Sequence, residues 1–384
     1  MATFVTGATG YLGSYVTARL LGAQAGRLSL LVRARDGAEA ERKLWKALQL
    51  HMPFGQFERY LRGRIELVLG DITLPRLGLS EQAYEKLAHG TDSIIHIAAS
   101  LNRRSERLCA DVNLRGTLEV VRFARTAHDR RGLRRFSDVS TTAVAGERSG
   151  ELVREDEAID WRRRDYDPYA RTKKFCEHML ETLLPDVPTT VFRPSTVMGD
   201  SRFGKTTQFD MVRAVWMLAR MKVIPLPSGA RHDIVPADYV GRAIADIHEQ
   251  EAPKHRIYHL SAGEGSESYR RIMERLRVGG RRLPHLFVPA LERPFGRSLA
   301  ALAVTPRGLG VSGAASLLNV FWPYVTFDTV FDNRRVVEAL GERPAPFSDY
   351  AGPLLEFALG HGFSYPHEPW PELRAVQEVL PSPA

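Results

Sequence analysis

Over its first half, the chain alternates short apolar runs with amphipathic stretches. The apolar runs predict β-strands at 2–7, 27–33, 64–71, 92–99, 134–140 and 188–194. Between them, apolar residues recur at helical spacing and predict helices over 11–22, 38–50, 80–88, 105–129 and 168–184. Strands separated by helices are typical of βαβ units, which build a parallel sheet covered on both faces. Because such crossovers are right-handed, we expect an α/β fold with a Rossmann-like doubly wound parallel sheet.

After residue 195 this alternation ends. Helices are predicted over 207–221, 237–249 and 266–277, with one short strand at 256–262. The segment 280–330 is rich in proline, glycine and large apolar residues, which indicates irregular, mostly helical structure, and the proline-containing tail from 365 is expected to be extended. We therefore expect a dinucleotide-binding domain over 1–195, with contributions from about 232–262. Residues 196–231 and 263–384 would form a smaller, mostly helical substrate-binding region.

The composition suits a water-soluble enzyme, with 384 residues of which 44% are hydrophobic and 26% charged. No apolar run is long enough for a transmembrane segment, and the apolar start runs directly into glycines rather than forming a leader peptide. A cytoplasmic protein is therefore expected. Cys109 and Cys176 lack the spacing of metal ligands, which predicts no metal site and two buried, unreactive thiols.

The formal net charge is +8, and arginines supply most of the positive charge in short clusters such as 130–135 and 270–277. These clusters are more typical of solvated helix faces than of a nucleic-acid site. No basic stripe with interleaved aromatic residues supports single-strand binding, so no nucleic-acid partner is expected. A further interpretation is attraction to an acidic carrier protein or to the phosphates of coenzyme A.

A glycine motif follows the first predicted strand, in the stretch TGATGYLG. Gly7 would allow a sharp turn, Gly10 the approach of a pyrophosphate to the backbone, and Gly13 close packing of the helix on the strand. The amides at the start of the helix would then point at the phosphates, namely those of Thr9, Gly10, Tyr11 and Leu12. This motif between a strand and a helix predicts a dinucleotide site.

The end of the second strand indicates which dinucleotide binds. An NAD site usually has an acidic residue there, whereas this chain has Arg33. A guanidinium at that position favours a 2′-phosphate, so NADPH is the predicted cofactor. Arg35, Arg42 and Lys43 are candidates for a second phosphate contact, and Asp36 lies too far past the strand to bind the ribose.

Tyr169 and Lys173 lie four residues apart at the start of the helix after the fifth strand, so they share one helix face. A hydride that reaches a carbonyl carbon leaves an oxyanion, which needs a proton and a positioning hydrogen bond. A phenol can supply the proton when a nearby ammonium favours its ionisation. Among the hydroxyls that end the fifth strand, Thr141 is the first candidate for the hydrogen bond, followed by Thr142 and Ser140.

These motifs resemble those of the extended short-chain dehydrogenases/reductases over about residues 2–262. The resemblance rests on TGATGYLG, GDI at 70–72, HIAA at 96–99, NLRGT at 113–117, STTAV and YARTK. It implies that Thr141, Tyr169 and Lys173 are catalytic and that Asn113 is structural. The implied cofactor contacts are Thr6, Gly7, Thr9, Gly10, Tyr11, Leu12, Gly13, Arg33, Arg35, Lys43, Asp71, Ile72, Ala98, Ala99, Lys173, Pro194 and Ser195.

Several separated segments are similar to one branch of that family, the thioester reductases, which are related to fatty acyl-CoA reductases. They include LVRARDGAEAERKLWKAL, GDITLPRLGLS and the stretch from Arg193 to Pro225. In that branch a basic residue about ten positions after the strand-end arginine grips the 2′-phosphate, and Lys43 fits best. Ser195 departs from the glycine that many relatives have after Arg-Pro. No adenylation or carrier domain precedes the first strand, so a free-standing reductase is expected.

The resemblance implies NADPH-dependent reduction of an acyl thioester, carried by coenzyme A or an acidic carrier protein, to an aldehyde. A second hydride transfer would give the alcohol. Alternatives of the same fold are a β-ketoacyl or sterol-like ketone reductase and a sugar-nucleotide epimerase or dehydratase. A different class is a non-catalytic dinucleotide-sensing protein, although such proteins often lose the tyrosine–lysine pair. An acyl channel has apolar candidates in Phe203, Phe209, Trp216, Met217 and Met221, for which core packing is the competing interpretation.

Overall fold

The computed structural model describes residues 1–23, 26–277, 281–304 and 312–371. At its centre lies a seven-stranded sheet in the order β12-β7-β5-β4-β1-β2-β3, with every neighbouring pair parallel. Its strands are β1 (Ala2–Thr6), β2 (Arg27–Val32), β3 (Ile65–Leu69), β4 (Ser93–His96), β5 (Arg135–Val139), β7 (Thr189–Pro194) and β12 (Ile257–Leu260). The doubly wound parallel sheet expected from the sequence is confirmed.

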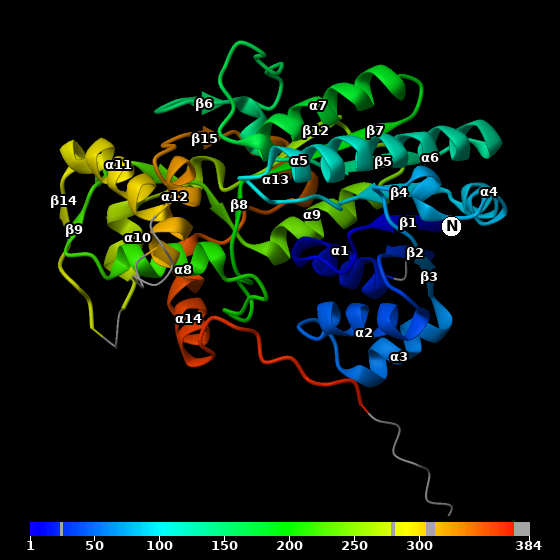
Figure 1. Ribbon diagram of the computed structural model, residues 1–384, viewed down its shortest axis with the longest axis horizontal. Helices are drawn as coiled ribbons and strands as arrows, with labels where there is room; N and C mark the ends of the chain where they lie inside the picture. The colour runs from blue at the N-terminus through cyan, green and yellow to red at the C-terminus, as the bar shows by residue number, and fades with distance from the viewer. Residues whose placement is uncertain (24–25, 278–280, 305–311, 372–384) are drawn as a thin grey trace, which may run out of the picture.

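Helices cover both faces of this sheet (Figure 1). One face packs against α1 (Tyr11–Gly22), α2 (Gly37–Leu48), α3 (Phe54–Gly63), α9 (Ala237–Glu249) and α13 (Arg334–Leu340). The other packs against α4 (Glu81–Gly90), α6 (Gly116–Arg131) and α7 (Pro168–Leu183). The strand order reverses at β1, with β2 on one side and β4 on the other, and this is where ligands bind in such sheets.

The helix predicted over 105–129 divides into three consecutive parts. These are α5 (Glu106–Cys109), a π-helical turn η2 (Ala110–Arg115) and α6. Asn113 in the π turn joins the loop after β4 to α7, because its side chain bonds the backbone of Ser100 and donates to Thr172 Oγ1 at 2.9 Å. The structural role implied for Asn113 agrees with these bonds. Both cysteines are free and buried, as predicted.

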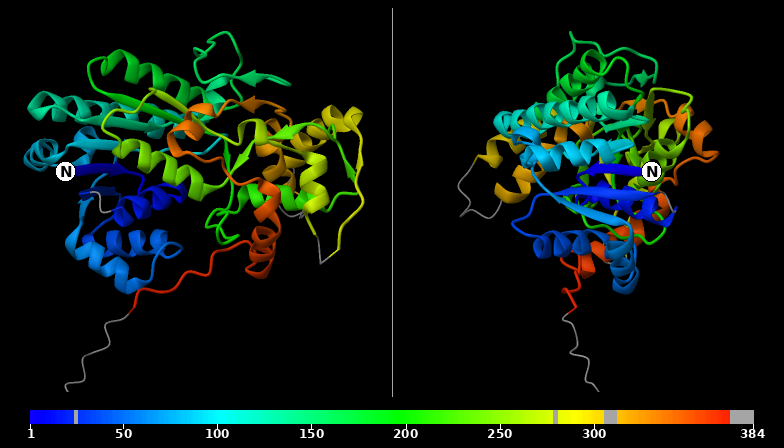
Figure 2. Two further views of the ribbon diagram at one scale, coloured as in Figure 1. Left: turned by 180° about the vertical axis from the view of Figure 1, so that it is seen from behind. Right: turned by 90° about the vertical axis from the view of Figure 1, so that its right-hand side faces the viewer.

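The C-terminal half adds a helical body beside the carboxyl ends of the strands (Figure 2). An apolar cluster joins α8 (Asp210–Ala219), α10 (Tyr269–Arg275) and α14 (Phe347–Gly360), and a second joins α8 to α11 (Glu292–Ala303) and α12 (Ser312–Val325). The helices α11 and α12 lie in the segment 280–330 predicted as irregular and mostly helical. The described end of the tail returns to α2 and α3, where the Trp370 ring packs on Phe54 and Phe57.

Paired short strands tie the two halves of the chain together. They are β6 (Leu152–Val153), β8 (Thr196–Val197), β9 (Val223–Ile224), β10 (Arg231–His232), β11 (Ile234–Val235), β13 (Glu267–Ser268), β14 (Leu286–Phe287) and β15 (Val330–Phe331). Strand β8 directly follows β7 and pairs with β11, which directly precedes α9. The pair β6–β15 connects the region after β5 to the C-terminal part of the chain. The remaining short turns are η1 (Pro75–Gly78), η3 (Thr142–Ala145), η4 (Gly263–Gly265) and η5 (Pro289–Leu291).

Candidate active site

The loop between β1 and α1 has the geometry that its glycines predict. Gly7 has φ of +79°, and a Cβ atom there would lie 2.6 Å from the backbone nitrogen of Ala98. A Cβ at Gly13 would lie 2.0 Å from the carbonyl oxygen of Gly7, so only glycine allows the helix to pack this closely. Gly10 caps α1 without a side-chain hydrogen bond, so the amides of the first turn remain available to an anion.

A cavity of about 510 Å³ opens at this loop and extends along the carboxyl ends of the strands. Most of the predicted cofactor contacts line it: Thr6, Gly7, Thr9, Gly10, Tyr11, Leu12, Gly13, Arg33, Asp71, Ile72, Ala98, Ala99, Pro194 and Ser195. Thr141 and Tyr169 line the same cavity. Residues far apart in the sequence therefore meet at one site, at the reversal of strand order.

The basic residues after β2 differ in their placement. Arg33 lines the cavity with a side chain that is 80% exposed, and its Nη1 lies 3.7 Å from Asp71 Oδ2. Arg35 and Lys43 do not line it. Both instead pair with Glu39 at 2.8 Å, and Lys43 also donates to the carbonyl of Arg33. Asp36 caps α2, accepting from the amide of Glu39, which agrees with its exclusion as a ribose ligand.

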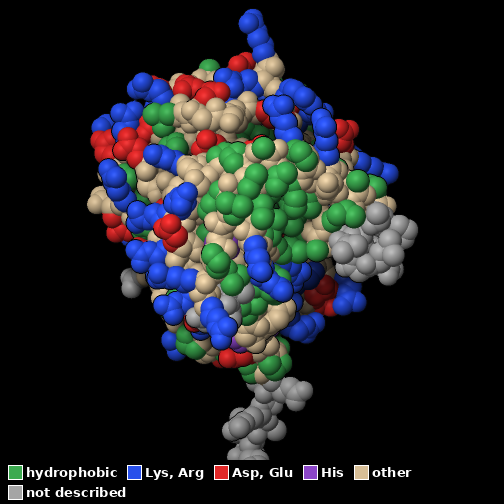
Figure 3. Space-filling model, turned by 90° about the vertical axis from the view of Figure 1, so that its left-hand side faces the viewer, with side chains coloured by type: hydrophobic (Ala, Val, Ile, Leu, Met, Phe, Trp, Pro, Cys, Tyr) green, Lys and Arg blue, Asp and Glu red, His purple; other side chains and the backbone are tan. Residues whose placement is uncertain are grey.

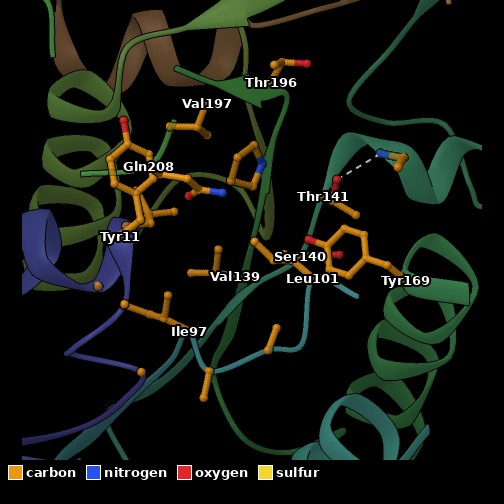
Figure 4. Close-up of a pocket in the computed structure, with 18 of the residues that line it drawn as sticks. Tyr11, Ile97, Leu101, Val139, Ser140, Thr141, Tyr169, Thr196, Val197 and Gln208 are labelled. Carbon is orange, nitrogen blue, oxygen red and sulfur yellow. Dashed lines mark hydrogen bonds between the residues drawn. The ribbon is translucent and has the colours of Figure 1, made fainter. Parts of the chain in front are cut away.

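Tyr169 and Thr141 stand next to each other on one side of the cavity, and Tyr11, Val197 and Gln208 lie on the opposite side (Figure 4). The Tyr169 ring is 7% exposed, and Thr141 lies close enough to lower the pKa of the phenol. Ser140 also lines the cavity, but its hydroxyl donates to Glu177 Oε1 at 2.5 Å. Thr142 lines the cavity from η3. This geometry favours Thr141 among the three candidate hydroxyls.

Lys173 lies one helical turn beyond Tyr169 and is fully buried rather than part of the cavity lining. Its Nζ is 3.6 Å from Oδ2 of Asp138 on β5, and neither oxygen of that carboxylate accepts a hydrogen bond from the described residues. Burial lowers the pKa of Lys173, but Asp138, Cys176, Tyr169 and Glu177 together outweigh this effect, so the net pKa is raised. The lysine therefore stays protonated beneath the phenol.

The pKa of Tyr169 is raised because burial disfavours the charged phenolate. Lys173, Arg103 and Thr141 act in the opposite direction, and Asp167 adds to the effect of burial. The phenol is therefore protonated at neutral pH. A buried, protonated phenol flanked by cations is suited to donating a proton to an oxyanion.

A second buried ion pair lies behind α7. Arg193 on β7 donates from Nη2 to Glu177 Oε2 at 2.6 Å and from Nε to Oε1 at 3.0 Å, and both side chains are about 5% exposed. Glu177 also accepts the bond from Ser140, so one carboxylate joins α7 to both β5 and β7. Sequence reasoning missed Asp138, Glu177 and Arg193. Each had a feature in the sequence that could have pointed to it. Asp138 is an acidic residue within an apolar strand, Glu177 lies one helical turn after Lys173, and Arg193 lies near the end of a buried strand.

At the far side of the cavity, Ser195 follows Pro194 at the end of β7. Its hydroxyl donates to Asp233 Oδ1 at 2.7 Å, and the amide of Ala262 donates to the same oxygen. Burial raises the pKa of Asp233 to about 6. Ser195, which stands where many relatives have glycine, thus hydrogen-bonds the buried carboxyl of Asp233 at the cavity wall.

A second cavity of about 700 Å³ adjoins the first and shares Leu101, Arg103, Gln208 and Phe321 with it. Of the apolar residues considered for an acyl channel, Trp216 and Met217 line it. Phe203 is instead 50% exposed, and Phe209 is a core residue stacked on Phe357. Met221 packs at the edge of the same core and lines neither cavity.

The residues present fit a dinucleotide. The glycine loop leaves space where any side chain would collide with the backbone, and the first turn of α1 offers amides without a capping side chain. Arg33 follows β2, the neighbour of β1, and supplies a positive charge to the same cavity. Glycine loops of this shape, placed before a helix, bind the pyrophosphate of a dinucleotide.

Comparison with known proteins agrees with this geometry. Residues 5–244 match the family described as male sterility protein, a family of NAD-binding proteins. The chain belongs to this family. The resemblance to the extended short-chain dehydrogenases/reductases of the thioester reductase type is thereby confirmed, and the chain is an oxidoreductase that uses a nicotinamide dinucleotide.

Among curated relatives, the aldehyde reductase lnaA of Aspergillus flavus is 30% identical over 266 residues, which cover 67% of this chain and 25% of lnaA. The glycine betaine reductase ATRR of Emericella nidulans is 26% identical over 264 residues, again 67% of this chain but 20% of that protein. This chain therefore matches a quarter or less of the length of each of these two relatives.

A solved structure, the terminal R domain of the myxalamid PKS-NRPS biosynthetic pathway, superimposes with a TM-score of 0.77 at 25% identity, covering 94% of this chain and 91% of that domain. The R domain of a nonribosomal peptide synthetase from Mycobacterium tuberculosis has a TM-score of 0.71 at 21% identity, covering 94% and 92%. The likeness to the Mycobacterium tuberculosis domain, at 21% identity, shows that the two chains share a fold. Within the described residues, no helix is both long and apolar enough to cross a bilayer.

Proposed function

We propose that this family member catalyses NADPH-dependent reduction of an acyl thioester to an aldehyde. The observation that carries the proposal is the buried pair of Tyr169 and Thr141 at a cavity that continues into a second, partly apolar cavity. The first cavity fits the cofactor, and the second offers room for an acyl chain or its carrier arm. The likeness to aldehyde reductases and to terminal R domains supports the same reaction.

When bound, NADPH supplies a hydride to the carbonyl carbon of the thioester. Thr141 and Tyr169 hold the carbonyl oxygen by hydrogen bonds, and Tyr169 gives its proton to the oxyanion as charge develops there. The product is a hemithioacetal. Its C–S bond then breaks, the hydroxyl proton is lost, and the sulfur leaves as a thiol once it is protonated, which yields the aldehyde. The protonated state of Tyr169 supports its role as the acid.

The preference for NADPH over NADH rests on Arg33. Its exposed guanidinium lines the cavity, and no acidic side chain ends β2 to accept bonds from a ribose 2′-hydroxyl. Lys43 donates to the backbone carbonyl of Arg33, so its ammonium lies beside that residue as a second cation. We propose Arg33 and then Lys43 as the phosphate ligands.

For the acyl donor, we propose an acidic carrier protein rather than free coenzyme A. Residues 275–297 contain six arginines and one acidic residue, Glu292. In the same part of the chain, Leu286, Leu291 and Val304 are between 43% and 84% exposed. Figure 3 shows apolar side chains gathered on the end of the molecule formed by this region, with Lys and Arg around them. Acidic helices of a carrier would complement such a surface. One solved relative joins a thiolation domain to its reductase domain.

The test offers the purified chain three substrates in parallel: acyl-CoA, the same acyl group on a carrier protein, and a ketone of similar size. NADPH consumption is followed by absorbance, and the aldehyde is trapped as a hydrazone. We expect turnover of the carrier-bound thioester with aldehyde release, at a rate that falls as salt is raised. Turnover of the ketone alone would refute the proposal, and NADPH binding without any turnover would favour the sensing class.

A further inference from the structure

Arg103 is a buried cation next to the catalytic phenol that the sequence did not single out. It lies in the loop after β4, at the carboxyl edge of the sheet, and lines both cavities. Its side chain is 19% exposed. The guanidinium carbon lies 5.6 Å from the ring centroid of Tyr169, 5.1 Å from that of Phe321 and 4.7 Å from that of Tyr324. Three aromatic rings from α7 and α12 therefore surround one positive charge.

The position of the guanidinium is well defined by its neighbours. Nε lies 3.4 Å from Asp167 Oδ2, and the Tyr324 hydroxyl donates to that same oxygen at 2.6 Å. Asp167 in turn caps α7 by accepting from the amide of Ala170. Arg103 Nε has no hydrogen-bond partner among the described residues, so its contact with Asp167 is ionic. A purely structural arginine at this burial usually satisfies its donors, which points to an electrostatic role here.

We propose that Arg103 is a positioning residue for the reaction proposed above: it holds the Tyr169 ring and stabilises the phenolate that remains after proton transfer. In that step the O–H bond of Tyr169 breaks and the proton goes to the substrate oxyanion. The negative charge moves to the phenol oxygen, which regains a proton from solvent before the next turnover. A guanidinium near an aromatic ring favours the anionic form of that ring.

The charges around Tyr169 support this assignment. Lys173 faces the phenol from its own helix, Arg103 from the loop after β4, and both lower its pKa against the effect of burial. Asp167 at the start of α7 raises the pKa of Tyr169, and Thr141 lowers it. Asp167, Tyr324 and Tyr169 itself act on Arg103, and Arg103 also acts on the thiol of Cys109. Loss of the Arg103 charge would leave the phenol dependent on Lys173, which is itself paired with Asp138.

The experiment compares Arg103→Met, Arg103→Gln and Arg103→Lys with the wild type. Arg107→Met is the control, because Arg107 lies on the adjacent helix α5 with a side chain that is 94% exposed and 3.8 Å from Asp111. The pKa of Tyr169 is measured by NMR on protein labelled with ¹³C at the tyrosine ring, with its signal assigned from its absence in Tyr169→Phe. Thermal unfolding checks that each variant folds.

We expect both neutral variants to raise the pKa of Tyr169 by about one unit and lower kcat about tenfold, with KM changed less than about twofold. Arg103→Lys should restore most of both values, and Arg107→Met should match the wild type. A folded neutral variant in which the Tyr169 pKa does not move would overturn the inference. The NMR result does not depend on the substrate, so failure of the proposed thioester reduction would be seen separately, as absence of turnover in the wild type.

Discussion

The buried pair of Arg193 and Glu177 gives the sharpest stability prediction, because it joins helix α7 to the sheet. Arg193→Met removes the cation and leaves the Glu177 carboxylate buried beside Ser140 and near the carboxylate of Asp138. Breaking a buried pair from one side costs about 3–5 kcal/mol, because the remaining charge has no partner. For a chain of 384 residues the unfolding entropy is about 0.8 kcal/mol per kelvin, so the thermal midpoint should fall by about 4–6 °C.

A second variant separates the loss of the ion pair from the loss of packing. The double variant Arg193→Met/Glu177→Gln keeps an acceptor for Ser140 without a buried charge, and it should regain most of the lost stability.

Differential scanning fluorimetry and urea unfolding measure these changes. The matched control is Arg125→Met, which breaks the Arg125–Asp186 pair. That pair has equally short bonds of 2.6 and 2.8 Å, but its side chains are 32% and 55% exposed. We expect a change of about 1 kcal/mol or less for this control. The reasoning is refuted if Arg193→Met and Arg125→Met have the same effect, or if the double variant is less stable than Arg193→Met.

Three further predictions concern the cavity. Tyr169→Phe should lower kcat by about 100-fold or more, since it removes the proton donor, while the Kd for NADPH measured by fluorescence stays within about twofold. Arg33→Asp should shift the ratio of kcat/KM values from NADPH toward NADH by about tenfold or more, and an unchanged ratio would exclude a 2′-phosphate contact. Asp233, whose pKa burial raises to about 6, should make the folded state lose stability as pH rises from about 4 to 6. Relative to the wild type, Asp233→Asn should therefore gain about 1 kcal/mol in urea unfolding between pH 5 and pH 7, and a difference that does not change with pH would contradict the raised pKa.

The sequence by itself determined the elements that depend on local periodicity. The helix predicted over 237–249 forms at Ala237–Glu249, and the helix predicted over 168–184 forms at Pro168–Leu183. The glycine spacing also identified positions where only glycine fits. Gly7 and Gly13 lie where a strand turns into a helix, and the neighbouring backbone atoms there leave no room for a side chain. Helix periodicity placed Tyr169 and Lys173 on one face. These features are readable because their physical cause lies within a few residues or in that strict order of elements.

Only the tertiary structure decided which charges surround the phenol of Tyr169. Arg103 meets Tyr169 because the loop after β4 and the start of α7 converge at the sheet edge, and Asp138 reaches Lys173 because β5 passes beneath α7. The sequence offered Arg35 and Lys43 as second phosphate contacts beside Arg33, yet both pair with Glu39 on α2 and neither lines the cavity. Burial and long-range pairing set these contacts, and neither leaves a periodic signal along the chain, since each depends on where distant segments pack.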